Sequence, residues 1–363
     1  MSRHSKMESK EQSMENEREP MSAMRDAPLR VGLIGCGGIA EVHAAVLAGL
    51  PPEAAVLTAV YDVAPERAEA LAGKFVGVRA LPSLDAMLEG GAVDALHLCT
   101  PHDLHVPHAL AALRNGLHVL SEKPAGISLG ELDALEEAAA GSVAQYGICL
   151  QNRYLPAVRR AQAMLAEGVL GAMLGSRAMV SWRREGAYYA ESGWRGTWAH
   201  EGGSAMINQA LHTLDLQCLL CGQPSRYEGS MHNLHLGGLI ETEDTCQLRI
   251  IFPGGAVGLF HASVSYGLDA PVVLEVHCEG GALRIEGDAL YLREGDSPWR
   301  HQQLPVYDPP GKLYWGAGHV LLIRDFYRAI AENRPFEIGF EEGTRALRPL
   351  LALYEEQRAR FIE

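Results

Sequence analysis

The stretch Val31–Ala40, "VGLIGCGGIA", decides how the first part of the chain folds. Apolar residues run into closely spaced glycines, and a segment with helical spacing follows, so a strand, a tight turn and a helix are predicted in that order. Gly35, Gly37 and Ala40 match the pattern G-x-G-x-x-[GA] at this junction. In that pattern the first glycine permits the turn, the second lets a pyrophosphate approach the backbone, and the third small residue lets helix and strand pack closely.

Strands and helices continue to alternate beyond this motif. The apolar runs predicted as strands cover residues 29–35, 54–62, 93–101, 117–124 and 143–151. Segments with helical spacing separate them, at residues 37–50, 65–75, 83–90, 105–116 and 128–141. This alternation predicts a doubly wound parallel sheet with helices on both faces, the Rossmann architecture that binds dinucleotides.

The end of the second strand indicates which dinucleotide is bound. Asp62 follows that strand at the spacing where an acidic side chain accepts hydrogen bonds from the ribose of NAD and repels the extra phosphate of NADP. Arg67 is expected within the next helix. The helix N-terminus around Gly38 and Ile39 supplies N–H groups for the phosphates. NAD is therefore predicted, with NADP the less favoured cofactor.

Composition limits the classes of protein that fit. The chain has 363 residues, 47% of them hydrophobic, which predicts a globular protein of about two domains. A formal net charge of −14 argues against a nucleic-acid partner, and no apolar run is long enough to span a membrane. Seven irregularly spaced cysteines, including the pair Cys218 and Cys221, are expected to be reduced core thiols, which predicts a cytoplasmic location.

Two further motifs carry a family resemblance. Thr100, Pro101 and His105 lie in "CTPHDLHVPHAL", and Glu122 and Lys123 begin "EKPAG" after the next strand. With "GGSAMINQALHTLDLQCLLCG" in the second half, the sequence resembles the Gfo/Idh/MocA family of nicotinamide-dependent oxidoreductases over about residues 29–355. The resemblance implies a cofactor domain, a second domain with a large open-faced sheet, and a homo-oligomer, a dimer or tetramer.

The second half agrees with that implied architecture. Alternating stretches occur between about residues 172 and 306, with turn signals between them, and the chain ends in two segments with helical spacing. The expected organisation is a disordered tail at 1–28, a Rossmann domain at 29–150, and an α+β domain with a mostly antiparallel sheet at 151–363.

Lys123, His212 and Asn208 are the predicted catalytic residues. Lys123 follows a strand at the carboxyl edge of the sheet, where it could polarise the reacting oxygen or help carry its proton. Asn208 and His212 are four residues apart, so a helix places both on one face, and Asp215 is expected to orient the His212 imidazole. Neutral imidazole suits the removal of an alcohol proton near pH 7.

Asn208 departs from the resembled pattern. Many family members carry aspartate at this position, completing a Lys–Asp–His set, whereas an asparagine amide orients a hydroxyl but exchanges no proton at neutral pH. The oxidoreductase interpretation is kept, with His212 as the base.

The remaining predicted sites are contacts to cofactor and substrate. The cofactor set is Gly35, Gly37, Gly38, Ile39, Ala40, Asp62, Thr100, Pro101, His105, Glu122 and Lys123. Aromatic faces and multiple donors suit a polyhydroxylated ring, which gives the substrate set Arg153, Tyr154, Tyr188, Trp194, Arg195, Asn208 and His212. His319 is a weaker candidate, and no metal is predicted at His102, His105 and His108.

The resemblance implies an NAD-dependent dehydrogenase for a secondary alcohol of a sugar, a sugar derivative (nucleotide- or acid-bearing forms included) or inositol. Two alternatives stay open. One is a glycosidase that oxidises its substrate transiently and recycles NAD, and the other is a non-catalytic nucleotide sensor, which would lack a competent Lys123 and His212 pair.

Overall fold

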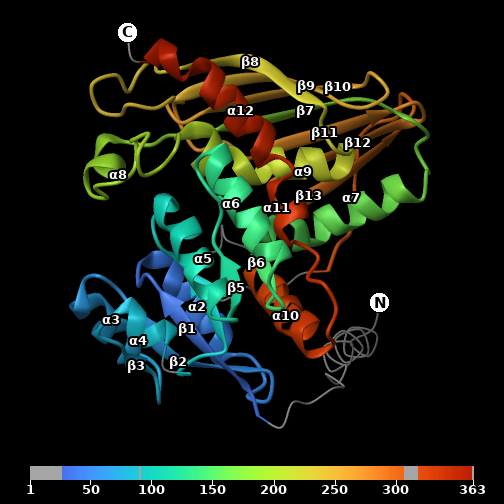
Figure 1. Cartoon of the computed structure of the whole chain (residues 1–363). Coiled ribbons are helices and arrows are strands. Elements are labelled where there is room, and N and C mark those ends of the chain that lie inside the picture. The colour runs from blue at the N-terminus through green and yellow to red at the C-terminus, as the bar shows by residue number, and fades with distance from the viewer. Residues whose placement is uncertain (1–26, 90, 306–317, 362–363) are drawn as a thin grey trace.

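Two β-sheets organise the chain, one in each half (Figure 1). The structure is a computed structural model that describes residues 27–89, 91–305 and 318–361. The tail expected at residues 1–28 lies outside the described part except for its last two residues. Among the described helices none is both long and apolar enough to cross a membrane.

The first sheet is six-stranded and parallel, with strand order β3-β2-β1-β4-β5-β6. Its strands are β1 (Leu29–Ile34), β2 (Ala55–Tyr61), β3 (Arg79–Ala80), β4 (Ala95–Leu98), β5 (His118–Ser121) and β6 (Tyr146–Ile148). This order is that of the doubly wound fold, in which ligands bind beyond the carboxyl ends of the strands where the order reverses, here between β1 and β4. The predicted Rossmann architecture is confirmed.

Helices connect these strands, as the sequence periodicity predicts. They are α2 (Gly38–Ala48), α3 (Pro65–Ala72), α4 (Leu84–Leu88), α5 (His105–Arg114) and α6 (Leu129–Ala140). Serine side chains cap two of them: Ser83 Oγ accepts from Ala86 N at 3.1 Å, and Ser128 Oγ accepts from Glu131 N at 3.2 Å. Each cap satisfies a backbone donor that has no partner within its own helix.

The second sheet is eight-stranded, with order β14-β13-β12-β11-β7-β10-β9-β8. Among the described strand pairs of this sheet only β7–β10 is parallel, so the sheet is mostly antiparallel, as expected. Its strands are β7 (Met173–Ser181), β8 (Arg226–His232), β9 (Thr245–Ile251), β10 (Val257–Ser263), β11 (Val273–Cys278), β12 (Gly281–Glu286), β13 (Ala289–Glu294) and β14 (Arg300–His301).

The two faces of this sheet differ in exposure. Helices α7 (Pro156–Ala166) and α9 (Leu211–Cys221) cover one face, where Ala178 and Val180 of β7 are buried. On the other face Met179 is 51% exposed and Leu259 is 57% exposed. The alternation along β7 therefore gives one covered face and one open face.

The C-terminal helices pack back onto both halves. They are α10 (Gly318–Ala331), α11 (Phe340–Thr344) and α12 (Leu347–Gln357), and α12 lies beside β8 in Figure 1. Tyr327 of α10 reaches the first sheet, with its hydroxyl 2.8 Å from His97 Nε2. Gln357 of α12 donates to Gly229 O of β8 at 2.6 Å. One hydrophobic cluster runs through both halves, so the site between the sheets rests on a continuous core.

Candidate active site

The turn after β1 requires glycine for a steric reason. Gly35 has φ +85°, and a Cβ on it would lie 2.6 Å from Cys99 O. Its N–H donates to Tyr61 O at 2.8 Å, which ties the turn to β2. A Cβ on Gly37 or Gly38 would meet no atom within 4 Å among the described residues, so the backbone there faces open space. These are the two properties that a pyrophosphate-binding turn needs.

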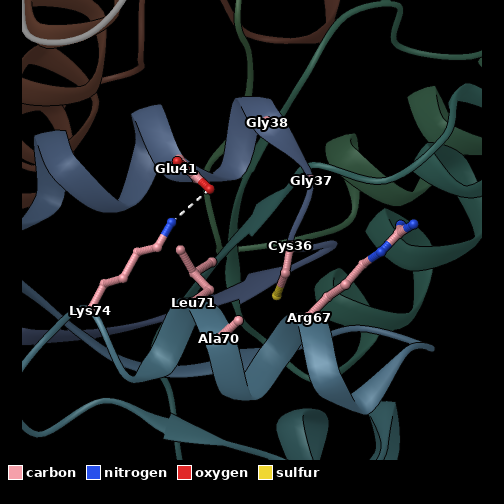
Figure 2. A pocket seen from close by; sticks show the side chains of 8 residues that line it. All are labelled: Cys36, Gly37, Gly38, Glu41, Arg67, Ala70, Leu71 and Lys74. Carbon is pink, nitrogen blue, oxygen red and sulfur yellow. Dashed lines mark hydrogen bonds and ion pairs between the residues drawn. The ribbon is translucent and has the colours of Figure 1, made fainter.

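A hollow of about 260 Å³ lies against this turn (Figure 2). Helices α2 and α3 form its walls, and its lining residues are Cys36, Gly37, Gly38, Glu41, Arg67, Ala70, Leu71 and Lys74. Among the described residues no side chain caps the N-terminus of α2, so its first N–H groups can donate to phosphate oxygens. Ile39 is half-buried and Ala40 is fully buried behind the turn, and Arg67 lies in α3 as expected.

Asp62 lies at the end of β2 and binds the turn itself. Its Oδ2 accepts from Cys36 N at 2.7 Å, and its Oδ1 accepts from Ala64 N at 2.9 Å. A carboxylate has about four acceptor sites, so capacity is left for ribose hydroxyls. Thr100 Oγ1 is buried at the neighbouring strand end with no hydrogen-bond partner among the described residues. An open helix N-terminus, a carboxylate and an unpaired hydroxyl together fit a bound dinucleotide.

Replacing Asp62 with serine and Val63 with arginine should move cofactor preference from NAD toward NADP by about ten- to a hundredfold. The change removes a negative charge beside the ribose and adds a positive one. Val63 is 84% exposed, so the arginine displaces no packing. Calorimetric titration of both cofactors measures the ratio of dissociation constants, with Val63→Arg alone as the control. Tighter NADP+ than NAD+ binding by the unaltered protein would contradict the role given to Asp62.

Lys123 follows β5 and reaches the second half of the chain. Its Nζ donates to Asn208 O at 2.8 Å and to Asn208 Oδ1 at 3.0 Å. An ammonium group has three N–H donors, so one remains for a substrate oxygen. Burial lowers the pKa of Lys123 from its usual value, although the nearby Glu122 and Glu201 oppose that change. A lysine with a lowered pKa can exchange a proton closer to neutral pH.

The segment that carries Asn208 is held by the close approach of Gly202 and by a buried carboxylate. A Cβ on Gly202 (φ +78°) would lie 2.5 Å from Ile127 Cβ, so this turn approaches the first half too closely for any other residue. Glu243 accepts from Ser204 N at 3.1 Å and from Met206 N at 2.9 Å. Residues Ala205–Ala210 then form a π-helix rather than the expected α-helix. Single π turns of this kind occur often at functional sites.

His212 lies in the first turn of α9, beside the same group of residues. Its Nδ1 is buried with no hydrogen-bond partner among the described residues, and its Nε2 lies 3.5 Å from Gln151 Nε2. Burial lowers the pKa of His212 to about 3, and the positive charge of Lys123 is the second largest cause of this change. The imidazole is therefore neutral at physiological pH, in the form that accepts a proton.

The expectation that Asp215 orients His212 is wrong. Asp215 Oδ2 and Oδ1 accept from Arg153 Nε at 2.8 Å and from Arg153 Nη2 at 2.6 Å. Arg153 also donates to Glu342, and its side chain is only 1% exposed. The ion pair is internal, because a buried guanidinium needs a carboxylate partner more than an imidazole does.

The structure does not place Arg153 and Tyr154 where they could contact a substrate, because both side chains have internal partners. Both are buried, and the hydroxyl of Tyr154 donates to Asp325 at 2.6 Å. Arg159 stacks on the Tyr154 ring, 4.5 Å from its centroid. These side chains join the segment after β6 to α9 and to the C-terminal helices, which is a structural role.

Three other predicted substrate residues do come together near Asn208. Tyr188, in α8 (Gly186–Ala190), accepts from Gln209 Nε2 at 2.8 Å and from Asn208 Nδ2 at 3.4 Å through its hydroxyl. Arg195 lies over the Tyr188 ring at 4.2 Å and over the Trp194 ring at 5.2 Å. This group offers an aromatic face and cationic donors beside the Lys123 ammonium.

The other predicted cofactor contacts form the wall between the two halves. His105 is buried, with Nδ1 2.7 Å from Pro124 O and Nε2 2.9 Å from Thr100 O, so its ring joins the loops after β4 and β5. Pro101 is half-buried before the short helix His102–Leu104. The polar contacts of Glu122 are internal, since His43 Nε2 lies 3.0 Å from its Oε1 and Lys123 N donates to its Oε2. A supporting role suits these residues better than direct contact with the cofactor.

His43, Glu122 and Cys149 place one potential metal-ligand atom each within 4.8 Å of one another. Both ring nitrogens of His43 already have partners, however, since Nδ1 lies 2.8 Å from His97 Nδ1 and Nε2 faces Glu122. The neighbouring His43 and His319 imidazoles hold the pKa of Glu122 well below its usual range, against the effect of burial. The cluster is thus explained as an internal hydrogen-bond chain, and no metal is proposed there.

Two residues of the site were not singled out from the sequence. Glu201 is completely buried next to the Gly202 turn, and Gln151 lies against His212. An acidic residue directly before a double glycine was the available signal for Glu201. Gln151 gave no comparable signal.

Comparison with known proteins agrees with this geometry. The family described as "Oxidoreductase family, NAD-binding Rossmann fold" matches residues 29–148, and the GFO/IDH/MocA C-terminal domain matches residues 158–284. The chain belongs to the GFO/IDH/MocA family. It is therefore an NAD-dependent dehydrogenase, built from a Rossmann domain and the sheet domain of that family.

Several members of the GFO/IDH/MocA family can be compared in detail. The chain is 23% identical over 360 residues to levoglucosan dehydrogenase of Pseudarthrobacter phenanthrenivorans, covering 87% of this chain and 92% of the relative. It is 26% identical to 1,5-anhydro-D-fructose reductase of Ensifer adhaerens, covering 89% and 95%. Among solved structures, the WlbA dehydrogenase from Bordetella pertussis, in complex with NADH and UDP-GlcNAcA, has a TM-score of 0.82 at 26% identity, covering 93% of this chain and 97% of that one.

Proposed function

We propose that the chain oxidises a secondary alcohol of a sugar or sugar derivative with NAD+, or catalyses the reverse reduction. The observation that carries this proposal is the meeting of Lys123, Asn208 and His212 beyond the carboxyl end of β5. NAD+ supplies the two-electron oxidant when it is bound. The chain's own task is then to hold the hydroxyl and to take its proton.

The proposed division of labour follows from the two pKa changes. The Lys123 ammonium donates its remaining N–H to the substrate oxygen, and neutral His212 accepts the proton. A base with a pKa of about 3 holds a proton only briefly. Lys123, whose pKa burial lowers, releases one of its own ammonium protons to solvent and takes up the proton from His212 in its place. Asn208 orients the Lys123 ammonium.

A sugar-like substrate is supported by two observations. Tyr188, Trp194 and Arg195 present an aromatic face and charged donors beside the catalytic pair, which suits a polyhydroxylated ring. The relatives of the chain include levoglucosan dehydrogenase, D-glucoside 3-dehydrogenase and 1,5-anhydro-D-fructose reductase. Inositol belongs to the same proposal as a cyclic polyol.

Purified protein should produce net NADH with NAD+ and at least one compound from a panel of D-glucose, methyl glucosides, levoglucosan, D-glucuronate and myo-inositol. Nicotinamide absorbance measures the rate, and Lys123→Met serves as the control for contaminating activity. Consumption of a glycoside without net NADH would replace this function by the NAD-recycling glycosidase. NAD binding with no turnover of any compound would favour a nucleotide sensor.

Assembly and location complete the proposal. The open sheet face carries exposed Met179 and Leu259, which supports a homodimer or homotetramer joined through that face. All seven cysteines are unpaired thiols, which supports a cytoplasmic location.

A further inference from the structure

Glu201 places a fully buried carboxyl group next to the catalytic residues. One carboxyl oxygen, Oε1, accepts from Asn208 Nδ2, and the other, Oε2, accepts from Gly196 N. The relative exposure of the residue is 0%. Its backbone carbonyl is also engaged, 2.9 Å from His102 Nδ1. A carboxyl group buried this completely needs a partner for each oxygen, and the segment Arg195–Asn208 provides both.

The Asn208 side chain connects this carboxyl group to Lys123. Asn208 Oδ1 accepts from Lys123 Nζ, and Asn208 Nδ2 donates to Glu201. An ammonium group can only donate and a carboxylate can only accept, so the Asn208 amide has one possible orientation between them. If the amide turned over, its N–H groups would face the ammonium and its oxygen would face the carboxylate.

We propose that Glu201 is a positioning residue that acts on Lys123 through Asn208. Ionised Glu201 holds the Asn208 amide so that Oδ1 faces Lys123 Nζ, and its negative charge favours the protonated form of that lysine. This inference deepens the proposed dehydrogenase function and rests on it. Glu201 touches neither the substrate nor the reacting atoms, so its effect reaches the reaction only through the charge and placement of Lys123.

The protonation of Glu201 should change within the working pH range. Burial raises the pKa of Glu201 to about 7, although the hydrogen bonds from Gly196 and Asn208 oppose this. The titratable and charged groups that surround it or its partners are Lys123 after β5, His102, Tyr188 and Tyr189 of α8, Arg195 and Glu243. Burial lowers the pKa of His102 and raises those of both tyrosines, so these three stay neutral near pH 7.

Removing the Glu201 charge changes the pKa of Lys123 in the same direction whether the lysine acts as an acid or as a base. Removing the charge of Glu201 lowers the pKa of Lys123, because an opposite charge nearby favours the ammonium form. The limb of the pH–rate profile that reports Lys123 should therefore move to lower pH, whether the reaction needs the ammonium or the free amine.

The test is the pH dependence of kcat/KM, over about pH 5 to 10, for NAD+ and the panel sugar oxidised fastest. The parent should show a limb near pH 7. In Glu201→Gln this limb should be absent, and the Lys123 limb should move down by about half to one pH unit. Glu201→Asp keeps the charge and should keep both limbs. Glu191→Gln is the matched control, because it removes an exposed carboxylate from the same part of the chain.

Two results would overturn the proposal: a Glu201→Gln profile identical to that of the parent, or a Glu201→Asp profile as altered as that of Glu201→Gln. An infrared titration of the parent with NAD+ bound gives a readout that needs neither turnover nor a folded variant. The C=O band of a protonated carboxyl group should disappear on raising the pH through about 7. If no panel compound is oxidised, the proposed function fails, whereas the absence of this band would mean that Glu201 stays ionised over the whole range and would overturn the limb near pH 7 assigned to it.

Discussion

Replacing Lys123 with methionine should lower turnover by about three orders of magnitude and change NAD binding far less. Methionine keeps much of the apolar stem but removes the charge and all three N–H donors. The substrate oxygen then loses its donor, and Asn208 O and Oδ1 lose theirs. Steady-state kinetics measure the loss of turnover, and calorimetry with NAD+ alone measures cofactor binding.

The same variant should also change His212. The positive charge of Lys123 is the second cause, after burial, of the low pKa of this imidazole. In Lys123→Met the His212 pKa should rise from about 3, which an NMR titration of the histidine protons can follow. Lys123→Arg keeps the charge and should leave that pKa low, yet it should also impair turnover, since a guanidinium does not release a proton. Turnover of Lys123→Met within a few-fold of the parent would exclude Lys123 from catalysis.

The Rossmann half was predictable because its signals are local. Position 35 must be glycine because the turn lies against Cys99, and such a steric requirement can be recognised in the sequence as a glycine motif. The apolar runs between helical segments reflect strands that are buried on both faces. The predicted strand at residues 54–62 differs from β2 (Ala55–Tyr61) only at its ends.

The local geometry around the proposed catalytic residues was not predictable from the sequence. The four-residue spacing of Asn208 and His212 predicts that both face one place on an α-helix, but the structure has a π-helix as far as Ala210. Hydrogen bonds from Ser204 N and Met206 N to Glu243 hold the first turn of this π-helix. No sequence pattern predicts a contact between residues about forty positions apart.

The errors have a common physical origin. Arg153 was predicted to contact the substrate because an arginine near aromatic residues suits a polyhydroxylated ligand. In the fold its partners are Asp215 and Glu342, which are 62 and 189 positions away along the chain. Glu201 was missed for the converse reason, because its importance lies in complete burial, and burial depends on how α8 and the Gly202 turn pack.

His212→Ala should lower turnover by about two to four orders of magnitude and leave NAD binding intact. The imidazole is the acceptor for the hydroxyl proton in the proposed reaction, and alanine leaves no group on α9 to replace it. Because burial keeps His212 neutral down to a pH of about 3, protonation of this residue should not limit the parent enzyme near neutrality. A limb near pH 7 would therefore not report His212, and the Glu201→Gln profile tests whether it reports Glu201.

Two comparisons decide the role of His212. His301→Ala removes an exposed imidazole from the far edge of the second sheet and should leave turnover unchanged. Added imidazole should restore part of the turnover of His212→Ala, because the vacated space lies at the point where the base acts. If His212→Ala works within a few-fold of the parent, the proton must leave by another group. Lys123, whose pKa is lowered by burial, would then be the base in its free-amine form, which has a lone pair for the hydroxyl proton.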